Sequence, residues 1–190
     1  MLAGAALVAS PAAAQEESRT QIHAFGGFAL PLADLGQVYY PVPGGVEYRH
    51  FKSGINFGAG FTYWLDRNLG VRIEGSYVGS KVVSPESSAS WKKLFFGGDI
   101  VLRALTAGGI NPYAYFGLGQ ARMDESGSSR TANRANARIG AGLNFAKESG
   151  GLGFFGEAGL LVYDFEQTLF PFYDKVQTDL ALKAGVTFGM

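Results

Sequence analysis

Seven charged residues stand at alternating positions inside otherwise apolar stretches of this 190-residue chain, and they are its best candidates for chemistry. In Arg72-Ile73-Glu74 the two charges are two residues apart, which places them on one face if the segment is a β-strand. Four are basic and three acidic, so they could neutralise one another inside a narrow protein interior: Arg72, Glu74, Asp99, Arg103, Arg138, Glu157 and Lys183. Alternatively, pairs that rearrange would form a gate for water or ions.

Other chemistries find less support in the residues. The chain has two histidines, His23 and His50, and neither lies in a His-x-Ser motif. There is no cysteine, which excludes disulfides and thiolate metal sites. The net charge is zero and no Lys/Arg run occurs, which argues against nucleic acid as a partner. We therefore expect no catalytic residues, no metal and no cofactor.

The elements that must position these charges are β-strands. Gly accounts for 28 residues, and each Gly inside a helix costs about 1 kcal/mol, so a helical bundle is disfavoured. Between Gly54 and Leu65 every second residue is apolar, which is the period of a strand. The same alternation predicts eight strands: 22–30, 54–65, 69–79, 94–104, 113–121, 137–145, 152–162 and 180–190.

The connections between these strands alternate between short and long. The short ones cover 66–68, 106–112 and 146–151, and the long ones cover 31–53, 80–93, 122–136 and 164–179. An up-and-down meander with an even number of strands produces this alternation. Short periplasmic turns and long extracellular loops are typical of outer-membrane barrels. We predict an all-β fold, an eight-stranded antiparallel up-and-down transmembrane β-barrel.

The polarity of the two strand faces separates a membrane barrel from a soluble, lipocalin-like carrier, in which the apolar face would point inward. Here the less apolar face carries mainly Gly, Ala, Ser and Asn with the seven charges, which suits a narrow interior. The bulky apolar face suits lipid. Aromatic girdles are expected at both ends of the apolar band, formed by Tyr63, Phe145 and Phe188 at one end and by Tyr77 and Phe96 at the other.

The N-terminus is typical of an export signal. Residues 1–14 are mostly apolar or small and end in Ala12-Ala13-Ala14, a small-x-small cleavage pattern. No Lys or Arg precedes the apolar run, as expected of a truncated signal peptide; an Ala-rich helical cap is the alternative. We expect a signal peptide over 1–14 and a barrel domain over 15–190.

Two segments carry a family resemblance. The C-terminus resembles the signal read by the barrel-assembly machinery through Lys183, Gly185 and Phe188, with Met190 in place of the final aromatic residue. Residues 64–77, WLDRNLGVRIEGSY, resemble the second hairpin of small outer-membrane barrels of the OmpA, OmpX and opacity-protein type. The resemblance implies a Gram-negative outer membrane, lipid and the assembly machinery as partners, and an interior with ion pairs such as Glu74–Arg103, Arg72–Asp99 and Glu157–Lys183.

The first and last long connections meet in a closed barrel, because the last strand pairs with the first. Both are rich in aromatic residues, which form a candidate contact patch for an extracellular or envelope protein: Tyr39, Tyr40, Tyr48, Phe51, Phe165, Phe170, Phe172 and Tyr173. These rings could instead pack together and cap the barrel. We expect a structural and surface-interaction role. The alternatives are a narrow channel for water or small solutes, a soluble carrier, and a lipid-modifying barrel enzyme.

Overall fold

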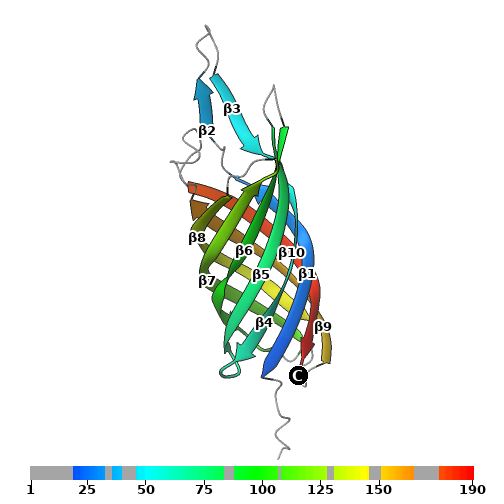
Figure 1. Ribbon diagram of the computed structural model, residues 1–190. Helices are drawn as coiled ribbons and strands as arrows, with labels where there is room; N and C mark the ends of the chain where they lie inside the picture. The colour runs from blue at the N-terminus through cyan, green and yellow to red at the C-terminus, as the bar shows by residue number, and fades with distance from the viewer. Residues whose placement is uncertain are drawn as a thin grey trace, which may run out of the picture.

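Eight long antiparallel strands close into one barrel, and a short hairpin extends beyond one end of it (Figure 1). The computed structural model describes residues 19–32, 36–39, 46–83, 88–106, 108–127, 131–145, 151–164 and 176–190. The export signal expected over 1–14 lies outside these residues. The barrel strands are β1 (Thr20–Pro31), β4 (Gly54–Trp64), β5 (Leu69–Val83), β6 (Ser88–Arg103), β7 (Ile110–Glu125), β8 (Thr131–Phe145), β9 (Gly151–Asp164) and β10 (Val176–Gly189).

The barrel is closed by pairing between the first and last strands. β1 pairs with β10 from Gln21↔Gly189 to Pro31↔Asp179, and each remaining strand pairs with its neighbours along the chain. The predicted eight-stranded meander is therefore confirmed. The described part of the chain contains no helix that is long and apolar enough to cross a membrane.

The two ends of the barrel differ. At one end, here called the turn end, β4 and β5 are joined by a tight turn in which the Asp66 carboxylate accepts the backbone N–H groups of Asn68 and Leu69, both at 2.7 Å. The opposite end is called the loop end. There the strands run further than the apolar pattern predicts. β5 continues to Val83 and β6 begins at Ser88, so only four residues separate them where a loop over 80–93 was expected.

The first long connection contains structure of its own. β2 (Gly36–Tyr39) and β3 (Val46–Phe51) form an antiparallel hairpin that projects past the barrel (Figure 1). The end of β3 pairs with β5 through His50↔Val83 and Phe51↔Val82. The hairpin is thus an extension of the barrel sheet, which the alternation of the sequence did not reveal.

The barrel turns its bulky apolar face outward. Ile73, Phe96 and Leu118 are each more than half exposed on the outer surface. The alternate positions, among them Arg72 and Asp99, are buried inside. This is the orientation expected of a transmembrane barrel and the reverse of the one that a soluble carrier requires.

Candidate functional site

A network of six charged side chains fills the middle of the barrel. They come from five strands and include three cations and three carboxylates, all at least 94% buried: Arg72 and Glu74 on β5, Asp99 on β6, Arg138 on β8, Glu157 on β9 and Lys183 on β10. Each faces inward because it lies on the face of its strand opposite to the exposed apolar side chains, as Arg72 does between Val71 and Ile73. The network carries no net formal charge, which is the arrangement that makes burial of six ions tolerable.

Asp99 and Glu157 are the two bridging carboxylates. Asp99 accepts the Arg72 Nε–H at 2.6 Å and the Arg138 Nε–H at 2.5 Å. Glu157 accepts from Arg72 Nη1 at 2.7 Å and from Lys183 Nζ at 2.8 Å. Two of the three pairs proposed between neighbouring strands, Arg72–Asp99 and Glu157–Lys183, are present in the structure.

Glu74 connects the remaining members of the network across the barrel. Its carboxylate accepts a hydrogen bond from Lys183 Nζ at 2.7 Å and lies 3.5 Å from Arg138 Nη1. His23 of β1 lies inside the barrel, with its Nε2 3.3 Å from the same carboxylate. Tyr113 of β7 donates its hydroxyl to Glu157 at 3.0 Å. Seven of the eight barrel strands therefore contribute a side chain, which ties opposite walls together.

Small residues on the barrel wall make room for this network. A Cβ on Gly117 would lie 1.8 Å from Asp99 Oδ1, and a Cβ on Gly159 would lie 2.1 Å from the hydroxyl of Tyr115. Tyr115 in turn places its ring 4.2 Å from the Arg72 guanidinium carbon, a cation–π contact. The glycine-rich inner face is thus complementary to the large polar side chains opposite it.

Arg103 does not join this network, and no Glu74–Arg103 pair forms. On β6 the residue opposite Glu74 is Gly97, six positions before Arg103, so Arg103 lies at the turn end. Its guanidinium stacks over the Trp64 ring at 3.7 Å, and its Nε donates to the backbone carbonyl of Arg67 at 2.8 Å. Arg103 therefore holds the turn instead of neutralising an interior carboxylate.

A second buried ion pair, which the sequence analysis missed, lies near the loop end. Lys93 Nζ donates to Asp179 at 2.9 Å and to the Tyr163 hydroxyl at 2.6 Å, and Tyr163 donates to Asp179 at 3.1 Å. The apolar alternation predicts long loops that end at Lys93 and at Asp179. Continuing the alternation of their strands would have found them, because Lys93 shares the parity of Asp99, and Asp179 shares that of Lys183.

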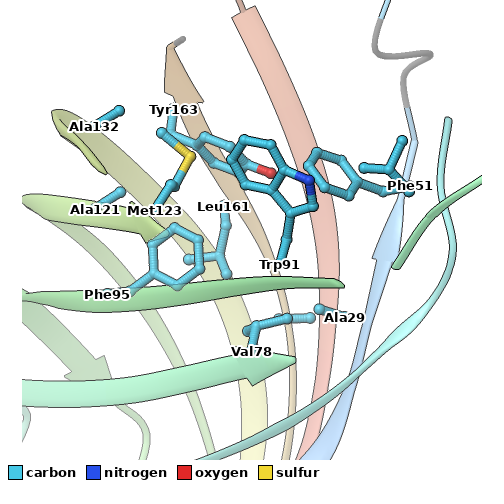
Figure 2. Packing of buried hydrophobic residues seen from close by; sticks show 12 residues of the cluster. Ala29, Phe51, Val78, Trp91, Phe95, Ala121, Met123, Ala132, Leu161 and Tyr163 are labelled. Carbon is cyan, nitrogen blue, oxygen red and sulfur yellow. The ribbon is translucent and has the colours of Figure 1, made fainter. Parts of the chain in front are cut away.

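A cluster of aromatic and apolar side chains fills the loop end (Figure 2), and the rings of Phe51 and Tyr163 contact the ammonium of Lys93. The rings of Phe51 and Trp91 pack edge to face with their centroids 5.9 Å apart, and the ring centroids of Phe95 and Tyr163 are 5.5 Å apart. The ammonium of Lys93 lies 3.8 Å above the Phe51 ring. We call Phe51, Trp91, Phe95, Met123 and Tyr163 the loop-end plug.

Phe51 was expected in an exposed contact patch, and the structure buries it inside the plug instead. Its backbone pairs with Val82, whose side chain is also buried, and residues paired across a sheet face the same side. Tyr39 and Tyr48 lie on the projecting hairpin, in β2 and β3. The other members of the expected patch lie outside the described residues: Tyr40, Phe165, Phe170, Phe172 and Tyr173.

The residues of the expected assembly signal occupy both faces of β10. Lys183 belongs to the central network. Gly185 lies close to the neighbouring strand β1 and to the Phe155 ring inside the barrel. A Cβ there would be 2.1 Å from the Ala24 carbonyl oxygen and 2.7 Å from Phe155. Phe188 and Met190 point outward and are exposed at the turn end.

A closed barrel that is apolar outside and carries paired charges inside defines the class of transmembrane β-barrels. The chain belongs to the outer membrane protein beta-barrel domain family, whose model matches residues 1–188. It is therefore a protein of the Gram-negative outer membrane. No curated protein sequence matches the chain.

Solved structures agree with this fold. OprG from Pseudomonas aeruginosa superposes with a TM-score of 0.61 at 14% identity, covering 93% of this chain and 98% of OprG. Neisserial surface protein A superposes with a TM-score of 0.60 at 14% identity, covering 91% and 98% of the two chains. The N-terminal barrel of Pseudomonas aeruginosa OprF gives 0.50 at 18% identity, covering 92% and 98%. At these identities the likeness extends to the fold alone.

Proposed function

We propose that this protein is a closed outer-membrane anchor that presents its extracellular segments for contacts at the cell surface. The observation that carries the proposal is the filled interior. The central network ties opposite walls together, and the loop-end plug occupies the end where the hairpin emerges. The interior of an eight-stranded barrel is only wide enough for side chains. Because these two layers fill it, the membrane-spanning part serves as a structural support.

The hairpin supports the second half of the proposal. β2 and β3 extend beyond the barrel, and Phe51 fixes their base inside the plug. An extension attached at its base through β5 carries its outer residues beyond the end of the barrel. Tyr39 and Tyr48 lie on it, and Tyr40 follows Tyr39 directly in the sequence.

Planar-bilayer recording of the refolded protein tests the closed interior. We expect no steady conductance from the wild type. Stable conductance steps that fall when Glu157 is changed to Gln would refute the closed anchor and establish an ion path through the central network. Retained heat-modifiable gel mobility would show that the variant is folded.

The surface role has its own test. Cells displaying the wild type are compared with cells displaying Tyr40→Ser or Phe172→Ser for capture of envelope and surface proteins. Ser128→Ala, in a polar connection, is the matched control. Capture that is lost in the aromatic variants and retained in the control supports the surface role, whereas equal capture by all four chains contradicts it.

A narrow water path is the second candidate. Asn56 and Asn136 are buried inside the barrel, and within the described residues neither side-chain amide has a hydrogen-bond partner. Unpaired buried amides are the groups to which internal water binds. Osmotic swelling of vesicles containing the protein measures this path directly. Swelling faster than that of protein-free vesicles, and slowed in Asn56→Leu, would favour the water path over the sealed anchor.

A further inference from the structure

Four cations follow one another around the outside of the barrel at the loop end. The backbone N–H of Lys52 donates to the carbonyl of Lys81 at 2.8 Å. Lys81 pairs with Ser90, two residues from Lys92, and Lys92 pairs with Asp124, two residues from Arg122. Lys81, Lys92 and Arg122 are therefore successive diagonal neighbours across β5, β6 and β7, within reach of one another for long side chains. All four residues are exposed.

Apolar side chains lie directly below these cations on the same outer face. Leu94 is two residues from Lys92 toward the turn end, is 50% exposed, and pairs with both Tyr77 and Arg122. Phe96, one step further, is 64% exposed. The cations therefore stand at the upper border of the band that contacts lipid, at the level of headgroups.

The cluster is concentrated on one side of the barrel. Among the described residues, the outward positions at the loop ends of β8, β9, β10 and β1 hold no Lys or Arg. One acidic residue, Asp124, faces Arg122 at 3.2 Å and also accepts the Thr131 hydroxyl at 2.6 Å. It balances only part of the positive charge. Asp124 also lies directly opposite Lys92, so it balances one of the four positive charges, and the excess positive charge of the cluster favours the binding of an anion.

From this placement we infer that the outer rim of β5–β7 is a binding site for the phosphate groups of a phosphorylated outer-leaflet lipid. Lys81, Lys92 and Arg122 take the phosphates, and Lys52 extends the positive rim. The acyl chains of the same lipid lie along Leu94 and Phe96. A soluble anion would use only the cations, whereas a lipid uses both layers of this surface. Basic side chains at a membrane surface contribute additively to the attraction of anionic lipids.

The test is equilibrium binding of fluorescent diphosphoryl lipid A to the full chain in neutral detergent micelles. Lys81→Gln/Lys92→Gln should bind about thirtyfold more weakly than wild type, from the usual contribution of two cations. The matched control, Arg19→Gln/Arg67→Gln, removes the same charge at the turn end and should bind as wild type does. Raising the salt concentration should weaken wild-type binding, since surface attraction is screened.

Two results would overturn the inference. One is undiminished binding by Lys81→Gln/Lys92→Gln, with folding verified by gel mobility. The other is equally tight wild-type binding of the same lipid after its phosphates are removed, because the acyl chains alone would then account for the affinity. Neither result bears on the sealed interior, which the conductance experiment tests independently.

Discussion

The buried pair of Lys93 and Asp179 should couple strongly to folding. Both side chains are at least 99% buried, and Lys93 makes its ion pair with Asp179 alone among the described residues. Lys93→Met would leave the carboxylate with only the Tyr163 hydroxyl, at 3.1 Å. Leaving one charge of a buried pair uncompensated costs about 3–5 kcal/mol. Asp179→Asn should cost a similar amount, because it leaves the ammonium without its counter-ion.

The double variant should cost much less than the sum of the two single variants, since it contains no unpaired charge. We expect a coupling free energy of about 2–3 kcal/mol in a double-mutant cycle. The assay is urea unfolding of the protein in neutral lipid vesicles, followed by the fluorescence of Trp64 and Trp91. A coupling below about 0.5 kcal/mol, the limit of additivity for independent sites, would refute the reasoning.

A matched control comes from an ion pair on the barrel surface. Arg122 and Asp124 lie 3.2 Å apart, with the Arg122 side chain 58% exposed. The same cycle with Arg122→Met and Asp124→Asn should give about 0.2–1 kcal/mol, since solvent screens exposed pairs. If the two cycles gave equal coupling, burial would not be the source of the effect.

Three further predictions address the turn, the glycine wall and the lipid face. The backbone N–H of Asn68, and next that of Leu69, holds the pKa of Asp66 below its ordinary 3.8. Its contribution to stability is therefore present above the unfolded pKa and lost as pH falls through the lower folded pKa; a carboxyl ¹³C titration midpoint at or above 3.8 would contradict this. Gly117→Ala should lower the free energy of unfolding by about 1–3 kcal/mol through its clash with the Asp99 carboxylate. Gly156→Ala, with open space around its Cβ, should change this free energy by less than about 0.5 kcal/mol. Equal urea midpoints for the two variants would refute the close packing of Gly117 against Asp99. Ile73→Arg should cost about 2–4 kcal/mol in vesicles, and no measurable cost would place this face outside the hydrocarbon layer.

The sequence by itself determined the eight barrel strands and the face that their alternating residues occupy. The reason is that strand periodicity is local: Arg72, Glu74 and Asp99 share the inner face because every second side chain points the same way. Consecutive strands are neighbours in a meander, which allowed pairs such as Arg72–Asp99 to be proposed. The sequence did not set their register, because Glu74–Arg103 was proposed between the same two strands and does not form.

Only the tertiary structure decided which charges meet across the barrel. Lys183 reaches Glu74 over a separation of 109 residues, and Arg72 reaches Glu157 over 85. These contacts depend on the curvature and stagger of a closed sheet, which no local pattern encodes. The same stagger leaves Arg103 at the turn end, away from Glu74. Phe51 is buried because β3 joins β5, a pairing between segments separated by a whole hairpin of the barrel.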